Sequence, residues 1–326
     1  MKRQKMTRIV ALAAFAWISF CGDLAAQNYP SRTITLVNPY AAGGPADLLA
    51  RAVAEGMASA LGQSVIVENR VGAGTAIAAA YVAHAQPDGY TLFIAGSPSH
   101  IIAPAISKSA KFDGIRDFVF ISMVGNVPNV LVVPSERPYK TVPDLIAAAK
   151  AANGSMNFAS VGQGSIPQLL GLKFQQAGGF KLVHVPYGGA APASTDLLAG
   201  RIDLGFLNLP PFIPHIQAGT IRALAIANEV RSEALPQLAT MGELGFADFD
   251  MSTWYGISAP AGTPRAIVDK LASAIAETLK SPSAKDKLAK AGIEMFLKGP
   301  DDYAAYVQQD AKRMLPLIDA AGLREN

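Results

Sequence analysis

Short apolar segments that favour strands alternate with amphipathic segments that favour helices along most of this 326-residue chain. Strands are expected at 33–38, 64–68, 90–95, 119–124, 129–134, 156–159, 181–185, 203–207, 222–227 and 254–259. Helices are expected at 45–61, 75–85, 141–152, 165–177, 190–199, 211–218, 264–280, 283–290 and 301–322. Because interleaved helices cover the faces of a sheet, this order predicts an α/β fold with mostly parallel sheets.

Two positions in this alternation are candidate lobe boundaries. They lie near Gly125–Pro128 and near Gly219–Asn228. Two boundaries around one central segment suggest that one lobe is inserted into another. We therefore expect a first lobe made of 27–125 plus 228–326 and a second lobe made of 126–227, joined by two crossover segments.

The first 26 residues, 1–26, have the pattern of a secretory signal peptide. An apolar core at Ile9–Phe20 follows a basic start and precedes the small residues Ala25 and Ala26. The core is shorter than the about 20 residues that a membrane-spanning helix needs. We expect cleavage near Ala26 and an exported, periplasmic product.

Removal of this leader changes the chemistry of the chain. Cys21 is the only cysteine, so the remaining chain has neither a thiol nor a disulfide. A lipid anchor on Cys21 would need a small residue before it, and Phe20 stands there. Four of the 28 basic residues and one of the 25 acidic ones lie in the leader, which leaves 24 of each. This balance gives no reason to expect nucleic acid as a partner.

The sequence contains no recognisable catalytic or metal-binding constellation. Ser97 and Ser165 do not fit the Gly-x-Ser-x-Gly elbow of hydrolases. Gly162–Pro167 breaks the dinucleotide pattern Gly-x-Gly-x-x-Gly at its last position. The four histidines are scattered without metal-ligand spacing, at His84, His100, His184 and His215. We expect no catalytic residue, no metal and no cofactor.

Five loops at the carboxyl ends of expected strands remain as a candidate binding surface, since open α/β sheets bind ligands there. They are Tyr40–Asp47, Gly96–His100, Ser160–Ser165, Pro186–Pro192 and Leu207–Pro211. Several of them combine a glycine turn with the start of a helix. The first N–H groups of a helix have no partner inside it and attract anions. The sequence therefore predicts a cleft lined with N–H donors.

Six motifs in a fixed order make a more specific pattern. They are Tyr29–Ile34, Ala41–Asp47, Val67–Gly74, Pro87–Leu92, Pro186–Pro192 and Trp254–Gly256. With them, the chain resembles the extracytoplasmic solute-binding proteins of tripartite tricarboxylate transporters, the Bug-type receptors. The resemblance implies a two-lobed periplasmic-binding-protein fold of the Venus-flytrap, type II-like kind. It also implies a small organic carboxylate as ligand and membrane permease subunits as partners, and we expect a monomer.

The resemblance also indicates where the ligand binds. Family members hold a carboxylate between two strand–turn–helix elements, through backbone N–H groups and bridging waters, and Tyr40–Asp47 and Ser160–Gln168 match them. The ligand-binding residues expected here are Tyr40, Ala42, Gly43, Gly44, Asp47, Ser97, His100, Ser160, Gly164, Ser165, Gln168, Tyr187, Ala190, Asn208 and Trp254. The chain departs from the family at three positions that commonly carry a histidine, an acid and a hydroxyl, namely Gln168, Leu207 and Ala46.

Several of these residues also have a purely structural interpretation. Asp47 favours the dipole of its helix without any ligand, and a ligand carboxylate would repel it unless water intervened. His100 fits a packed loop histidine. Tyr40 and Trp254 stand at strand ends beside glycines, which favours the cleft wall over the core. Tyr187, between Pro186 and Gly188, is expected to contact the ligand.

Two other classes of function stay open at the level of the sequence. One is an exported hydrolase, which the missing nucleophile–base pair disfavours, and the other is a flytrap that senses a ligand for a signalling partner. For a receptor, Leu207 in place of an acid predicts a ligand whose far end is apolar or aromatic rather than amino-bearing. If Leu207 packs in the core, Asp47 stays available to an amino acid.

Overall fold

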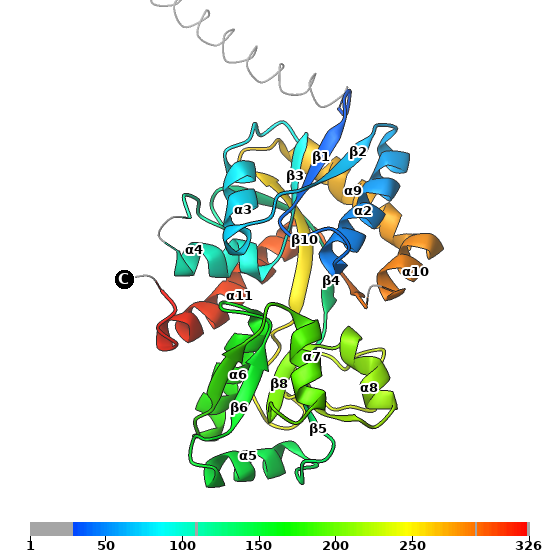
Figure 1. Ribbon diagram of the computed structural model, residues 1–326. Coiled ribbons are helices and arrows are strands. Elements are labelled where there is room, and N and C mark those ends of the chain that lie inside the picture. The colour runs from blue at the N-terminus through cyan, green and yellow to red at the C-terminus, as the bar shows by residue number, and fades with distance from the viewer. Residues whose placement is uncertain (1–28, 108–109, 291, 325–326) are drawn as a thin grey trace, which may run out of the picture.

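The computed structural model describes residues 29–107, 110–290 and 292–324, and Figure 1 shows two groups of strands and helices joined by long strands. The expected signal peptide, 1–26, and Cys21 lie outside the described residues. The α/β, two-sheet architecture confirms the predicted fold class.

The first sheet has six strands in the order β11-β4-β10-β3-β1-β2. They are β1 (Ile34–Asn38), β2 (Val65–Asn69), β3 (Thr91–Ala95), β4 (Phe118–Val127), β10 (Thr253–Pro260) and β11 (Glu294–Lys298). The strands β1, β2 and β3 pair in parallel, whereas β10 pairs antiparallel with both β3 and β4. Strand β11, which the sequence does not predict, pairs antiparallel with β4 at the edge.

The second sheet has five strands in the order β7-β6-β8-β5-β9. They are β5 (Asn129–Pro134), β6 (Asn157–Ser160), β7 (Val183–Pro186), β8 (Leu204–Asn208) and β9 (Ile221–Ile226). Here β6 pairs in parallel with β7 and β8, and β5 pairs antiparallel with β8 and β9. The expectation of mostly parallel sheets is therefore wrong, because the strands that carry the chain between the two sheets run against their neighbours.

The helices match the expected segments closely, apart from the turns at 98–106. The long helices are α2 (Pro45–Leu61), α3 (Ala76–Ala83), α5 (Val142–Ala151), α6 (Ile166–Gly178), α7 (Ala190–Leu198), α9 (Arg265–Lys280), α10 (Pro282–Lys290) and α11 (Pro300–Ala320). Shorter turns are η1 (Ala73–Thr75), η2 (Pro98–Ile102), α4 (Ala103–Ile106), η3 (Pro210–Phe212) and α8 (Ile213–Gln217). Among the described residues, no helix combines the length and the apolar character needed to cross a membrane.

The chain crosses between the sheets at two places. Strand β4 passes into β5 through Pro128, and the chain returns from β9 to β10 through 227–252. Most of this return packs on the second sheet, since Met241 N–H donates to Ile226 O at 2.8 Å and the Phe249 and Phe206 rings lie 6.1 Å apart. The sequence assigns 228–326 to the first lobe; in the structure, 228–251 contacts both sheets, since Ser232 and Glu233 also bond to Glu294 of β11. The residue limits of the lobes stay a prediction.

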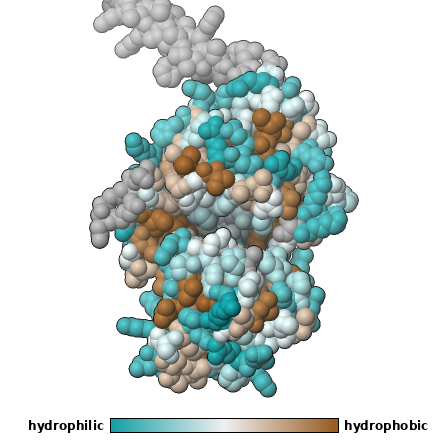
Figure 2. Space-filling model, in the orientation of Figure 1, coloured by the Kyte–Doolittle hydropathy of each residue, from teal (hydrophilic) through white to brown (hydrophobic). Residues whose placement is uncertain are grey.

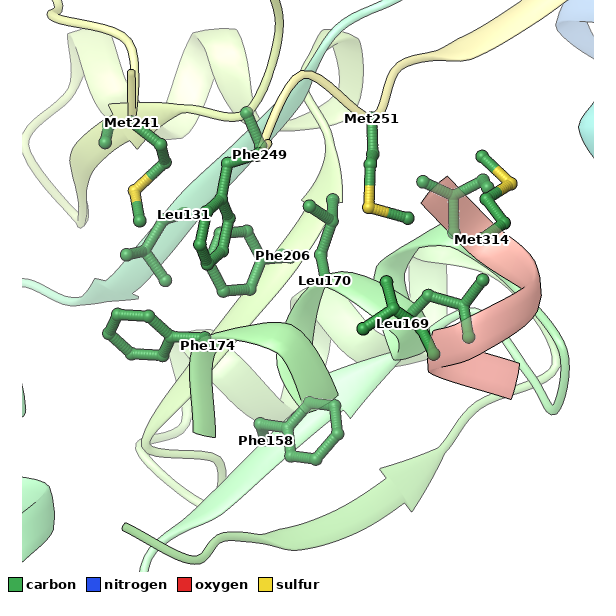
Figure 3. Packing of buried hydrophobic residues seen from close by; sticks show 14 of the residues in the cluster. Leu131, Phe158, Leu169, Leu170, Phe174, Phe206, Met241, Phe249, Met251 and Met314 are labelled. Carbon is green, nitrogen blue, oxygen red and sulfur yellow. The ribbon is translucent and has the colours of Figure 1, made fainter. Parts of the chain in front are cut away.

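One buried apolar cluster runs through both halves of the molecule. It includes Phe120 of the first sheet and Phe158 of the second. Figure 3 shows Met314, from α11, beside Met251 and Leu169 of the second half. Helix α11 therefore packs against both halves and connects their cores.

Candidate functional site

A cavity of about 750 Å³ lies where strands of the two sheets end. Four of the expected ligand-binding residues line it: Tyr40 after β1, Gly164 and Ser165 before α6, and Asn208 at the end of β8. Figure 2 shows a hollow between the upper and lower halves of the molecule. The structure thus brings together residues from the first, third and fifth candidate loops, and Pro98 of the second loop also lines the cavity.

Asn208 and Tyr40 each contact another residue of the cavity lining. Asn208 Nδ2 donates to Thr253 Oγ1 at 3.1 Å, and the Tyr40 and Tyr255 rings meet edge to face at 6.2 Å. Burial raises the pKa of the Tyr255 phenol to about 12 and that of the Tyr40 phenol further. Both phenols therefore stay neutral at physiological pH and can donate hydrogen bonds.

The turn before α3 also lines the cavity, although the sequence does not predict it as part of the site. Ala73, Gly74 and Thr75 have φ values of 45°, 58° and 83°, so three successive residues are left-handed. A β-branched residue in this region is strained, and such strain concentrates at functional sites. Thr75 Oγ1 is buried and has no hydrogen-bond partner among the described residues. Only the glycines of the Val67–Gly74 motif signalled this turn.

A further part of the lining is apolar, and two of its residues come from 98–106, where the sequence predicts no helix. Ile102 and Ile106, from η2 and α4, line the cavity together with Val161 and Ile166 of the β6–α6 region. A Cβ atom on Gly164 would lie only 3.1 Å from Ile106 Cδ1 and 3.2 Å from Ile102 Cγ2. The absence of a side chain at Gly164 therefore lets the second half approach this apolar surface.

The β1–α2 turn is held in shape by Asp47, which is 2% exposed. Gly43 N–H donates to Asp47 Oδ2 at 3.0 Å, where the positive φ of 85° suits glycine. Arg51 donates Nε to Oδ2 and Nη2 to Oδ1, at 2.9 and 3.1 Å, and Asn69 Nδ2 donates to Oδ1 at 2.9 Å. Ala42 lies in the exposed part of the turn, and Gly44 is the N-cap of α2.

These contacts decide the protonation state of Asp47. Burial opposes its ionisation, but the hydrogen bonds from Arg51, Gly43 and Asn69 outweigh burial and hold its pKa well below the usual range. Asp47 is therefore a fixed carboxylate whose oxygens are already occupied. Asn38 Nδ2 also donates to Oδ1, at 3.4 Å, so the contacts of Asp47 with the described residues fit its structural interpretation.

Beside the β6–α6 turn, Ser160 of β6, Gln168 of α6 and the half-buried His184 of β7 form a hydrogen-bonded network. Gly164 N–H donates to Gln168 Oε1 at 2.7 Å, so the amide nitrogen of Gln168 points the other way and lies 3.3 Å from His184 Nδ1. His184 Nδ1 is then the acceptor, and Nε2 carries the hydrogen that it donates to Ser160 Oγ at 2.7 Å. Burial lowers the pKa of His184, which favours this neutral form.

This network brings a serine and a histidine together, which the sequence did not predict, but in the wrong orientation for nucleophilic catalysis. A catalytic histidine must accept the serine proton at Nε2, while a carboxylate accepts its Nδ1–H. Here Nε2 is the donor, and the Ser160 hydroxyl donates to Gly162 O at 3.1 Å. In this arrangement the pair shapes the loop.

Tyr187, Ala190, Ser97 and His100 are not among the residues that line the cavity. Tyr187 OH donates to Asp196 Oδ2 at 2.7 Å, and Ala190 begins α7. Ser97 is fully buried. His100 is also buried, with Nδ1 donating to Gly114 O at 2.7 Å, as a packed loop histidine would.

Trp254 corrects an expectation of the sequence analysis. It is 0% exposed and therefore belongs to the core rather than to the cleft wall. Its Nε1–H donates to Asp310 Oδ2 at 2.7 Å, which satisfies the polar end of the indole inside the protein. Leu207 is equally buried, and Asn208 is the residue that faces the cavity from this strand. Within the described ranges, no group of three or more His, Cys, Asp or Glu side chains is arranged to hold a metal ion.

Comparison with known protein families gives a match over most of the chain. Residues 49–323 match the model described as the tripartite tricarboxylate transporter family receptor. The chain is also 34% identical to protein BugT of Bordetella pertussis, over 98% of this chain and 99% of BugT.

Solved structures with the same fold include two with bound carboxylates. Rpa4515 of R. palustris, solved with adipate, has a TM-score of 0.77 and 34% identity, covering 90% of this chain and 98% of its own. MatC of Rhodopseudomonas palustris, solved with bound malate, has a TM-score of 0.74 and 30% identity, covering 89% of this chain and 100% of its own.

Proposed function

Because the chain belongs to the tripartite tricarboxylate transporter receptor family, we propose that it is a periplasmic receptor that binds a small organic carboxylate in the cavity between its lobes. The observation that carries this proposal is the convergence of elements from both sheets, Tyr40, Thr75, Gly164 and Asn208 among them, on one cavity. Relatives solved with adipate and with malate support the carboxylate class.

The proposed carboxylate site uses helix N-termini rather than a cation. Helices α3 and α6 begin at the cavity, and α2 begins five residues after Tyr40. The first N–H groups of a helix, at the positive end of its dipole, bind anions without a charged side chain. Asp47 and Gln168 take the role of holding the two turns in shape, because their side chains bond to the backbone of Gly43 and Gly164.

In this proposal the protein is a receptor and not an enzyme. The donor orientation of His184 towards Ser160 leaves the serine without a general base. We also propose that the leader 1–26 is removed on export, that the receptor acts as a monomer, and that it delivers its ligand to membrane permease subunits.

The test is ligand binding by the purified receptor and by two matched glycine variants. Carboxylates should raise the melting temperature of the wild type without being consumed. Gly43→Val should abolish binding in a folded protein, because valine is strained at a φ of 85° and displaces the turn. Gly62→Val imposes similar strain at the other end of α2, where φ is 68°, and should leave binding intact.

Three results would contradict the proposal. Unchanged affinity in a folded Gly43→Val protein would show that the turn does not form the site. Equal loss of affinity in both variants would show that only the stability of α2 matters. Turnover of a bound carboxylate would make the protein an enzyme.

A further inference from the structure

We infer that Thr75 binds the ligand, through a hydrogen bond from its side-chain hydroxyl to an oxygen of the ligand carboxylate. This inference rests on the proposed function and deepens it by naming a binding residue outside the turns at 40–47 and 160–168. Three properties of Thr75 carry it: its place in the cavity lining, its buried hydroxyl without a partner and its left-handed backbone.

The hydroxyl of Thr75 is the observation that points to a ligand. Among the described residues, six buried side-chain polar atoms have no hydrogen-bond partner, and they belong to Thr75, Ser97, Ser99, Asn126, Tyr303 and Arg313. Of these six residues, only Thr75 lines the cavity, and it is 6% exposed. A buried hydroxyl without a partner destabilises the folded protein. A ligand in the cavity could supply the acceptor that this hydroxyl lacks.

The backbone at Thr75 is as unusual as its hydroxyl. In the part of the chain that the structure describes, four residues other than glycine have a positive φ, namely Ala73, Thr75, Asn153 and Asp248. Asn and Asp tolerate this region, whereas the β-branched Thr75 is strained at a φ of 83°. Backbone strain persists where the surrounding structure enforces it, and it concentrates at ligand sites. Strain and a buried hydroxyl without a partner therefore coincide at one residue of the cavity lining.

The left-handed backbone also keeps Thr75 from capping its own helix. Thr75 is the N-cap residue of α3, a position where threonine normally has an extended backbone and accepts a hydrogen bond from the first turn of the helix. At a φ of 83° and a ψ of −10° its side chain makes no such bond. A ligand carboxylate that accepts from this hydroxyl would lie beside the N-terminus of α3, where the helix dipole also favours an anion.

The hydroxyl reaches a ligand through a small movement, because Oγ1 is buried in this structure. Rotation of the Thr75 side chain about its Cα–Cβ bond, or a shift of the turn, exposes Oγ1 to the cavity. Gly72 and Gly74, with φ values of 145° and 58°, allow such a shift since they have no Cβ atom. The bond to the carboxylate then offsets the cost of the buried hydroxyl, so that ligand binding stabilises the turn.

Calorimetry with malate, adipate, hexanoate and phenylacetate, on the wild type and three variants, tests the inference. Thr75→Val removes the hydroxyl and keeps the shape of the side chain, whereas Thr75→Ser keeps the hydroxyl. Tyr303→Phe is the matched control, since it removes a buried hydroxyl without a partner from a residue outside the cavity lining. Thr75→Val should weaken each acid that binds the wild type at least about tenfold, and the other two variants by less than about threefold. Ligand-free Thr75→Val should melt at the temperature of the wild type or higher, because a methyl group replaces a buried hydroxyl without a partner.

The outcomes distinguish a failure of the inference from a failure of the proposed function. Unchanged affinity in Thr75→Val, or an equal loss in Thr75→Val and either of the other variants, overturns the inference and leaves carboxylate binding established. A lower melting temperature of ligand-free Thr75→Val would show that the hydroxyl stabilises the fold, which also overturns it. So does a loss confined to malate, because Thr75 would then bind the hydroxyl that malate alone of the four acids carries. If none of the four acids binds the wild type, the proposed function fails together with the inference.

Discussion

Two buried ionisable residues, His100 and Asp310, make opposite contributions to the stability of this protein as the pH falls. Burial lowers the pKa of His100 from 6.5 to about 4. Between these values the unfolded chain binds a proton that folded His100 does not, so the free energy of unfolding decreases as the pH falls towards 4. The full effect is about 3 kcal/mol.

Asp310 has the reverse sign. Burial raises its pKa to about 6, against the opposing hydrogen bond from Trp254 and the charge of Arg313. Between about 4 and 6 the folded protein holds a proton that the unfolded chain releases, so the stabilisation from Asp310 is present at low pH and is lost as the pH rises through 6. The contributions of the two residues nearly cancel in the wild type.

Asp310→Asn removes the pH-dependent contribution of Asp310 to the free energy of unfolding and keeps that of His100. The variant keeps an acceptor for the indole of Trp254 but cannot take up the proton. We expect it to lose about 2–3 kcal/mol more than the wild type in the free energy of unfolding between pH 7 and pH 4.5. Urea unfolding at both pH values measures the difference, with Asp319→Asn at an exposed position as the control. Equal decreases in the free energy of unfolding for Asp310→Asn and the wild type would contradict this prediction.

At the scale of elements, we base a second prediction on the close contact between β10 and α11. A Cβ atom on Gly256 would lie 2.4 Å from Tyr303 Cζ and Oη, and Tyr303 is fully buried. Gly256→Ala should therefore lower the free energy of unfolding by about 1–3 kcal/mol, through overpacking. Gly188→Ala, where nothing lies within 4 Å, should change it by less than about 0.5 kcal/mol. Equal changes in the free energy of unfolding for Gly256→Ala and Gly188→Ala, measured by urea unfolding, would show that close packing against Tyr303 does not exclude a side chain at Gly256.

Elements with strong local signals were predictable from the sequence. Helix α2 begins at Pro45 and ends at Leu61 as expected, because proline favours the first turn and Gly62 ends the helix with a φ of 68°. Strand β11 was missed because its residues alternate between half-buried and exposed at a sheet edge, with Met295 and Leu297 on the exposed side. The antiparallel direction of β10 depends on distant partners, which no local pattern encodes.

The glycine turns of the candidate site were predictable from the sequence, but the other residues that line the cavity were not. Glycines at 43 and 164 marked the β1–α2 and β6–α6 turns. The left-handed Thr75 carries no glycine signal, and Ile106 belongs to a short helix that local propensity does not reveal. The contact between Gln168 and His184 joins two elements and depends on the pairing of β6 with β7.

At the scale of the whole molecule, the packing of α11 restricts how the two halves can move. Its buried residues join a cluster that contains Phe120 of the first sheet and Phe158 of the second. Separation at α11 would expose apolar core, whereas Tyr40 of the first turn and residues 163–167 of the second line the cavity. Motion between the halves should therefore be a rigid-body rotation that pivots at the crossings and α11 and closes the cavity.

Closure of this kind predicts that ligand makes the protein more compact. Small-angle scattering should give a smaller radius of gyration with a saturating carboxylate than without it, and Gly43→Val should show no change. Hydrogen exchange should slow in 40–47 and 160–168 on binding and stay equally slow in the buried turns of α11, because the pivot does not open. Equal radii with and without ligand would indicate a cavity that is already closed. Faster exchange in α11 on binding would place the pivot elsewhere, since a helix that joins both cores can loosen only if the halves separate on its side.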